Sequence, residues 1–151
     1  MGRWLDHTVI TEVQAPVAQV WTVWSDLEAM PRWMRWIESV KTREDPDLTD
    51  WTLAAQGFRF QWKARITSRI DQQQLLWESV GGLPTKGGVR CYQEQPELTA
   101  VKLSVGYELP GILAPLMEPS ILGGIVTKEL QANLDRFRDL VESGYTPRTE
   151  P

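Results

Sequence analysis

Hydrophobic and polar residues alternate along residues 7–15, a period of two that is typical of a strand with one buried face. The period changes at Pro16, which suits the first turn of a helix because proline has no N–H to leave unpaired. The following apolar residues repeat at helical spacing and form one stripe: Val17, Val20, Trp21, Trp24 and Leu27. We predict a helix here, with Trp21 and Trp24 packed inside, and a second short helical stretch over residues 28–37.

From residue 38 to residue 109 the pattern predicts consecutive antiparallel strands. It is clearest over residues 58–70, where an apolar set alternates with charged and polar residues: Phe58, Phe60, Trp62, Ala64 and Ile66. So clean a split indicates one buried and one solvated face. Further strands are predicted over residues 38–44, 48–56, 75–80, 88–95 and 100–109. Pro96 and Glu97 mark a hairpin turn between the last two.

The chain ends in a predicted long helix with this buried stripe: Leu122, Val126, Leu130, Leu134, Phe137 and Val141. One strand, two short helices, about six further strands and one long helix indicate an α+β fold rather than a doubly wound sheet. For a chain of 151 residues we expect a single domain over residues 1–144, followed by a C-terminal tail over residues 145–151.

Composition and charge narrow the class of function. Lys and Arg number 16 against 20 Asp and Glu, a net charge of −4, which argues against nucleic acid as a partner because phosphate binding needs a basic face. One cysteine and one histidine exclude a disulfide framework and a multi-thiolate zinc site, so we expect no metal and no cofactor. Cys91 is expected to be a small buried hydrophobe, and His7 a solvated residue near a sheet edge. Eight tryptophans against three Phe and three Tyr indicate an extensive aromatic interior.

The N-terminal residues lack the apolar core of a secretory signal. The longest apolar stretch, residues 110–126, is broken by Pro115, Glu118 and Pro119, so it cannot span a bilayer as one helix. These two features lead us to expect a soluble, cytoplasmic protein.

Residues 13–40 contain a longer recognisable pattern. A strand ends in Ala15-Pro16, Val-x-x-Val-Trp follows, and then Ser-Asp-Leu-Glu-x-Met-Pro-x-Trp. Together with the C-terminal Leu-x-x-x-Leu-x-x-Phe helix over residues 130–137, this pattern resembles the polyketide cyclase/dehydrase branch of the START-like (helix-grip) superfamily. That branch includes the coenzyme Q-binding Coq10-type proteins. The resemblance covers about residues 7–143 of this chain.

The resemblance implies a curved antiparallel sheet of about seven strands around the long C-terminal helix, with an apolar cavity between them. Such a ligand site has a volume of roughly 300–1,000 Å³ and would hold a lipid, an isoprenoid quinone, a polyketide or a similar molecule. The strand periodicity turns these ligand-binding candidates towards it: Phe58, Phe60, Trp62, Trp77, Leu103, Val105 and Tyr107. The alternative is that the helix buries them as ordinary core. We expect the Tyr107 hydroxyl or the Trp62 N–H to fix the headgroup.

The second helical stretch and a later apolar segment are expected to form the cavity mouth: Met30, Trp33, Met34, Leu113, Leu116 and Met117. Arg32 and Arg35 lie among the apolar residues of this stretch, which also include Trp36 and Ile37. Trp and Arg together suit a transient contact with a membrane interface or a protein partner through Trp33 and Trp36. The alternative is that these residues form a small secondary core.

The leading hypothesis for function is non-catalytic binding and carriage of a hydrophobic small molecule, an isoprenoid quinone or a lipid. One alternative is an aromatase/cyclase-type enzyme that acts on a polyketide. Another is an interaction module that uses the Trp33/Trp36 helix. No Ser-His-Asp, Cys-His or paired-carboxylate arrangement can be identified in the sequence, so a catalytic role rests on the resemblance alone.

Overall fold

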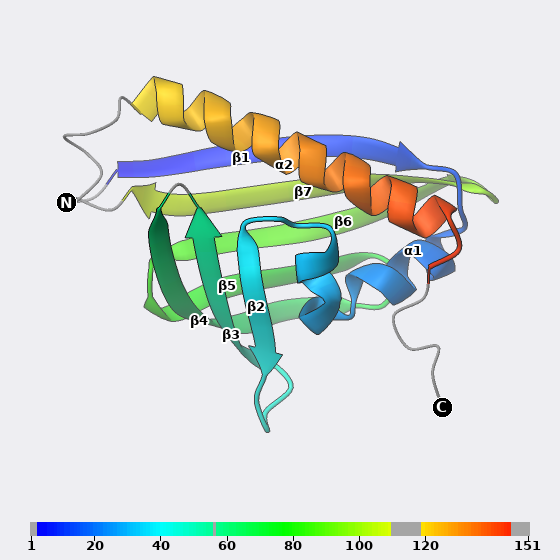
Figure 1. The fold of residues 1–151 in the computed structure, drawn as a ribbon. Coiled ribbons are helices and arrows are strands. Elements are labelled where there is room, and N and C mark those ends of the chain that lie inside the picture. Colours follow the sequence, from blue (N-terminus) through cyan, green and yellow to red (C-terminus); the bar gives the residue numbers. More distant parts are fainter. Residues whose placement is uncertain (1–2, 56, 110–118, 146–151) are drawn as a thin grey trace.

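Seven strands form one antiparallel sheet in the order β1-β7-β6-β5-β4-β3-β2. The computed structural model describes residues 3–55, 57–109 and 119–145 (Figure 1). The strands are β1 Arg3–Val13, β2 Ile37–Thr42, β3 Leu48–Ala55, β4 Phe58–Ile70, β5 Gln74–Gly82, β6 Thr85–Gln95 and β7 Leu98–Leu109. Strands β2 to β7 pair with their neighbours in sequence, and β1 pairs with β7 at the edge.

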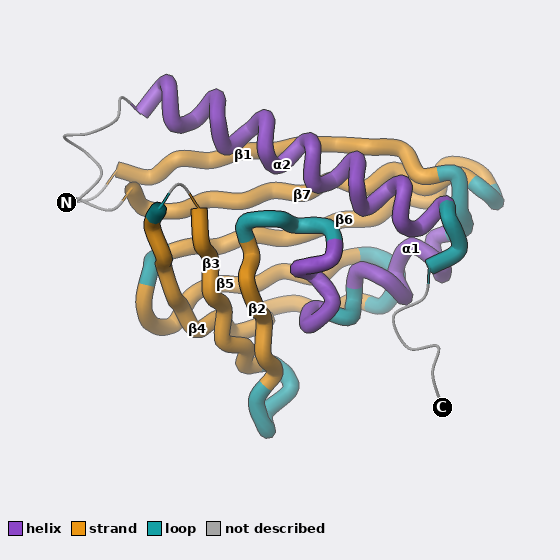
Figure 2. Tube along the Cα trace, viewed as in Figure 1, coloured by secondary structure: helices purple, strands orange, loops and turns teal. Residues whose placement is uncertain are grey.

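Two short helices link β1 to β2, and a long helix follows the sheet. They are α1 Val17–Trp24, the 3-10 helix η1 Leu27–Arg32 and the C-terminal α2 Pro119–Glu142. The sheet curls, and α2 lies across its concave side (Figure 2). This arrangement confirms the predicted α+β helix-grip fold. The described helices include none that is long and apolar enough to cross a membrane.

The second helical stretch is shorter than predicted and ends at Arg32 instead of residue 37. Pro31 lies inside it and has no N–H to continue a hydrogen-bonded ladder. The N–H groups of Trp33 and Met34 both bond to the carbonyl oxygen of Met30, at 3.1 and 2.9 Å. This tight turn closes the helix and sends the chain into β2.

Strand β6 begins at Thr85, three residues before the predicted start at residue 88. The glycine pair Gly87-Gly88 suggests a break in the sequence, but the structure places both residues inside the strand. A Cβ atom on Gly87 would lie 2.8 Å from Cζ2 of the Trp77 ring. Glycine is therefore required here because the Trp77 side chain lies against the strand backbone.

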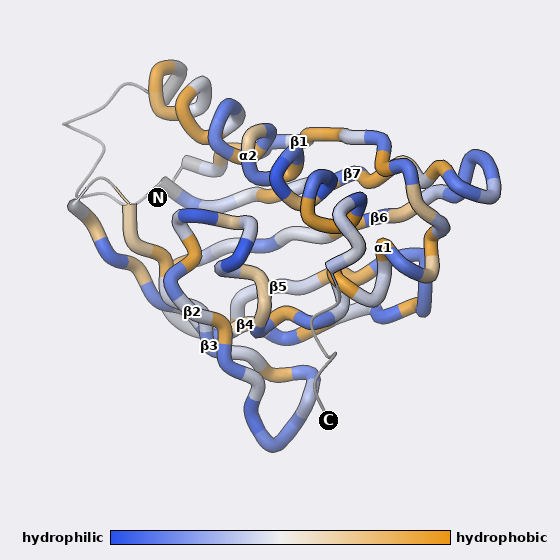
Figure 3. Tube along the Cα trace, turned by 45° about the vertical axis from the view of Figure 1, so that its right-hand side comes forward, coloured by the Kyte–Doolittle hydropathy of each residue, from blue (hydrophilic) through white to orange (hydrophobic). Residues whose placement is uncertain are grey.

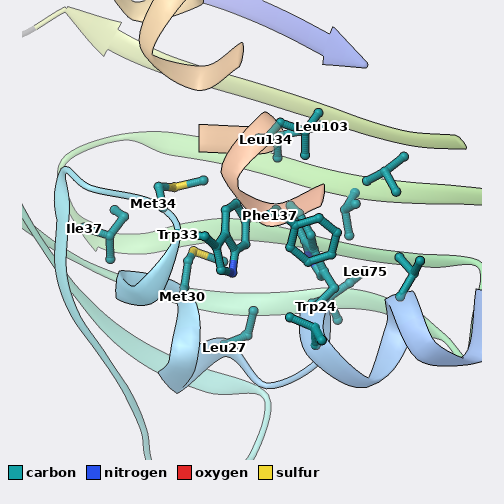
Figure 4. Close-up of a cluster of buried hydrophobic side chains, with 14 of the residues drawn as sticks. Trp24, Leu27, Met30, Trp33, Met34, Ile37, Leu75, Leu103, Leu134 and Phe137 are labelled. Atoms are coloured by element: carbon teal, nitrogen blue, oxygen red, sulfur yellow. The ribbon is translucent and has the colours of Figure 1, made fainter. Parts of the chain in front are cut away.

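The main core lies at one end of the sheet, where α1, η1 and α2 meet (Figure 4). The rings of Trp24, Trp33 and Phe137 pack together, with centroids 4.7, 5.1 and 5.0 Å apart. Trp21 and Trp24 are buried as predicted. Trp33 is 1% exposed, so the predictions of a cavity-mouth position and of a membrane or protein contact through Trp33 are wrong. The physical reason is that α1 and α2 both pack against the indole and remove it from solvent.

Candidate ligand-binding cavity

A cavity of about 210 Å³ lies between the concave face of the sheet and α2. Its lining is apolar or aromatic except for Thr85, Glu129 and Asn133. The sheet and the segment before β2 contribute Met30, Met34, Trp36, Ile37, Trp51, Leu53, Ala55, Phe58, Phe60, Trp62, Trp77, Leu83, Thr85, Val105 and Tyr107. An apolar cavity of about 150 Å³ is large enough to bind benzene. The enclosed space therefore suits a ligand with one or two rings.

Three tryptophans build one wall of the cavity. Trp51 on β3 lies opposite Trp62 on β4 in the register, and their rings stack at 5.7 Å with a 16° angle. Trp51 also stacks on Trp77 of β5 at 5.7 Å and 26°. The Trp51 Nε1 donates to Thr49 Oγ1 at 2.7 Å, so its polar atom is satisfied. These indoles occupy much of the concave face, and the cavity is smaller than the predicted 300 Å³ lower bound.

The structure places six of the seven ligand-binding candidates in the cavity lining: Phe58, Phe60, Trp62, Trp77, Val105 and Tyr107. Leu103 is not among the lining residues and is fully buried in the core. Of the residues predicted at the mouth, Met30 and Met34 line the cavity and Trp33 does not. Leu113, Leu116 and Met117 lie outside the described residues. That the six bind a ligand stays a prediction.

Helix α2 supplies the opposite wall, which the sequence analysis did not assign to the site: Leu122, Ile125, Val126, Glu129, Leu130 and Asn133. Its first turns carry hydrophobic residues (Figure 3). Ile125 is 39% exposed and lines the cavity, so the cavity reaches the surface there. The sequence does contain a pattern that could have identified Glu129 and Asn133 as residues of the site. Glu129 and Asn133 follow Val126 and Leu130 by three residues each, which places two polar side chains on the apolar stripe.

A buried histidine lies behind the cavity wall. His7 is 7% exposed, so the prediction of a solvated residue is wrong. Its Nδ1 lies 2.9 Å from Thr127 Oγ1 on α2, and its Nε2 lies 3.1 Å from the Tyr107 hydroxyl on β7. Helix α2 covers β1 and so removes the ring from solvent. Burial lowers the pKa of His7, opposed by the nearby charge of Asp6.

The Tyr107 ring stacks on His7 with centroids 5.5 Å apart and an angle of 14°. Burial raises the pKa of Tyr107 to about 12, so its hydroxyl stays protonated at neutral pH. A neutral imidazole donates from one nitrogen and accepts at the other. The three side chains therefore join β1, β7 and α2 through two hydrogen bonds, and one of them, Tyr107, also lines the cavity.

A second polar contact fixes the wall between η1 and β2. The backbone N–H of Arg35 donates to Asn133 Oδ1 at 3.4 Å, and the Arg136 guanidinium donates to the same oxygen. Arg136 Nε also donates to the carbonyl oxygen of Trp33 at 3.1 Å. These bonds satisfy the side-chain oxygen of the buried Asn133 and hold the segment with Met34 and Trp36 against α2.

Neither a metal site nor a reactive cysteine is found among the described residues. Within residues 3–55, 57–109 and 119–145 no group of three or more His, Cys, Asp and Glu side chains is placed to hold a metal ion. Cys91 is buried as predicted, and burial raises its pKa to about 12. Its sulfur is therefore a protonated hydrophobic group rather than a nucleophile.

Comparison with known proteins finds a relative by sequence and similar solved structures. An uncharacterized 17.2 kDa protein in the melC2-rnhH intergenic region of Streptomyces lincolnensis is 26% identical over 132 residues, which covers 87% of this chain and 85% of that protein. A START superfamily protein from Mycobacterium smegmatis has a TM-score of 0.76 at 15% identity over 95% of this chain and 100% of that one. The Zhui aromatase/cyclase from Streptomyces sp. R1128 has a TM-score of 0.74 at 18% identity over 100% of both chains. At these identities the two structures show the fold alone.

The family model for polyketide cyclase / dehydrase and lipid transport matches residues 13–137. The matched segment runs from the end of β1 to the last turns of α2 and includes every residue that lines the cavity. It also contains the Val-Trp and Ser-Asp-Leu pattern on which the resemblance was based. This chain therefore belongs to the polyketide cyclase / dehydrase and lipid transport family.

Proposed function

We propose that this protein binds and carries a small hydrophobic molecule in the cavity between the sheet and α2, without changing it chemically. The observation that supports the proposal is an internal space of about 210 Å³ with an almost entirely apolar and aromatic lining. Cores are otherwise packed to high density, so a cavity of this size needs a reason. Membership of a family that includes lipid transport gives one.

The size of the cavity limits how tightly a ligand that fits entirely inside it can bind. A single ring the size of an aromatic side chain buries about 150–250 Å². At about 25 cal/mol per Å², burying this area contributes about 4–6 kcal/mol to the free energy of binding. This corresponds to a dissociation constant no tighter than about 0.05 mM. Tighter binding needs more apolar area. The opening at Ile125 lets a chain attached to the ring extend outwards, which fits an isoprenoid quinone of the Coq10 type or a lipid.

The test combines native mass spectrometry with solvent extraction of the purified protein and a matched pair of variants. Ala55 lines the cavity, whereas the adjacent Ala54 points to the other face of β3 because side chains alternate along a strand. Ala55→Trp is expected to displace cargo, and Ala54→Trp is expected to retain it. Wild-type protein that binds no quinone, lipid or small aromatic probe, or an Ala55→Trp variant that binds as the wild type does, overturns the proposal.

A second candidate is a reaction of the aromatase/cyclase type, and one observation favours it. Tyr107 lines the cavity and its hydroxyl is held by His7. A fixed, protonated phenol can donate a hydrogen bond to a ligand carbonyl oxygen. Mass analysis of ligand recovered after incubation separates the two functions. Chromatographic retention is recorded together with mass, because ring closure alone leaves the mass unchanged and only loss of water lowers it. A changed mass or retention with wild type that is absent with Tyr107→Phe would identify catalysis, and ligand unchanged in both properties with both proteins supports carriage.

A further inference from the structure

Two buried polar atoms in the cavity wall have no hydrogen-bond partner among the described residues: Trp62 Nε1 and Glu129 Oε2. Trp62 is only 8% exposed. Buried polar atoms in native proteins are nearly always paired, so each unpaired atom requires an explanation. The indole N–H can only donate, and a glutamate oxygen accepts. Two residues that line the cavity therefore carry, inside its walls, one unused donor and one unused acceptor.

The two atoms come from opposite walls of the cavity. Trp62 belongs to β4 in the sheet, and Glu129 belongs to α2. The other polar side chains of the lining each have at least one hydrogen-bond partner. Thr85 Oγ1 donates to the carbonyl oxygen of Gly106 at 2.8 Å, the Tyr107 hydroxyl bonds to His7, and Asn133 Oδ1 accepts from the Arg136 side chain. A molecule between the sheet and α2 lies between the two side chains that carry the unsatisfied atoms.

We propose that the cargo is a neutral, mainly apolar ring compound with a hydroxyl that donates to Glu129 and a carbonyl-type oxygen that accepts from Trp62 Nε1. This inference rests on the proposed function and specifies the chemical class of its ligand. A hydrocarbon would leave both atoms unpaired, and a quinone has no donor for Glu129. A fatty acid would place a second carboxylate beside Glu129, and like charges repel. Among quinoid molecules the reduced quinol supplies the donor that a quinone lacks, and the oxygen of its other hydroxyl can accept from Trp62 Nε1 in place of a carbonyl.

Each contact can be tested with probes that differ in one group and have nearly the same shape. 4-Ethylphenol and 4-ethyltoluene differ in a hydroxyl, and acetophenone and α-methylstyrene differ in a carbonyl oxygen. Dissociation constants are measured by calorimetry or ligand-observed NMR for wild type, Glu129→Met and Trp62→Phe. Glu129→Met keeps a side chain of similar length, Trp62→Phe keeps an aromatic ring but a smaller one, and far-UV circular dichroism checks that each variant is folded.

The expected result is a crossed pattern. Glu129→Met should lower the affinity for 4-ethylphenol relative to 4-ethyltoluene about tenfold, because one hydrogen bond to a glutamate oxygen is lost. The affinity for acetophenone relative to α-methylstyrene should not change. Trp62→Phe should lower the affinity for acetophenone relative to α-methylstyrene about fivefold and should leave the affinity for 4-ethylphenol relative to 4-ethyltoluene unchanged. Probes that bind with the same ratios to all three folded proteins overturn the inference and leave the proposed function intact. A folded wild type that binds none of the four probes overturns both.

Discussion

Trp33 gives the sharpest test of how this chain divides its tryptophans between core and cavity. The perturbation is Trp33→Ala. The indole is 1% exposed and packs on Trp24 at 4.7 Å and on Phe137 at 5.0 Å (Figure 4). Its carbonyl oxygen also accepts from Arg136, a bond that the substitution leaves in place. The expected loss is therefore one of packing alone.

The magnitude follows from these contacts. Replacing a fully buried Trp by Ala costs about 3–5 kcal/mol, and the two ring contacts favour the upper half of that range because each aromatic pair adds about 0.5–1.5 kcal/mol beyond its buried area. The entropy of unfolding is about 2.1 cal/mol/K per residue, or about 0.3 kcal/mol/K for a chain of this length. A loss of about 4 kcal/mol therefore lowers Tm by about 13 °C.

The assay is reversible thermal and urea unfolding followed by circular dichroism, with Trp36→Ala as the matched control. Trp36 lies three residues away, is half-buried and lines the cavity. Its removal should cost about 1–2 kcal/mol and should weaken ligand binding instead. A Trp33→Ala variant within about 1 kcal/mol of wild type would refute the core assignment and restore the interpretation of Trp33 as a surface contact.

Three further predictions concern single positions. Because burial lowers the pKa of His7, the unfolded chain binds a proton at higher pH than the folded protein. The free energy of unfolding should then fall as pH drops below about 6.5 and level off below the folded pKa, as measured by urea unfolding against His7→Asn. Gly82 has φ +84°, and an added Cβ would lie 2.7 Å from Trp62 Cα, so Gly82→Ala should cost more than about 2 kcal/mol in the same assay. Cys91, buried with a pKa raised to about 12, should resist a thiol reagent at about pH 8 until the protein is unfolded.

Each of these has an outcome that contradicts it. Parallel stability curves for wild type and His7→Asn between about pH 7.5 and about pH 5.5 would show that burial does not shift the His7 pKa. Gly81→Ala is the control for Gly82, since nothing lies within 4 Å of an added Cβ there. Equal costs at the two positions would disprove the steric argument. Rapid labelling of Cys91 in native protein would mean that β6 opens readily.

Much of the fold was readable from local pattern. The alternation over residues 58–70 places Trp62 and Ile66 on the concave face, and the structure buries both. The stripe on the last helix predicts the buried Leu134 and Phe137. The local pattern was misleading where the residue type is required by a contact with another strand. Gly87 suggests a turn but makes room for Trp77.

The sequence by itself determined which residues face inwards, because the periods of strand and helix are local properties of the chain. Only the tertiary structure decided which inward residues meet and where space remains. His7 finds its partners 100 and 120 positions away, and Glu129 becomes a cavity residue because α2 crosses a curled sheet. The curl and the helix position arise from packing between distant segments. A local pattern therefore identifies an inward face but not whether core or cavity lies against it.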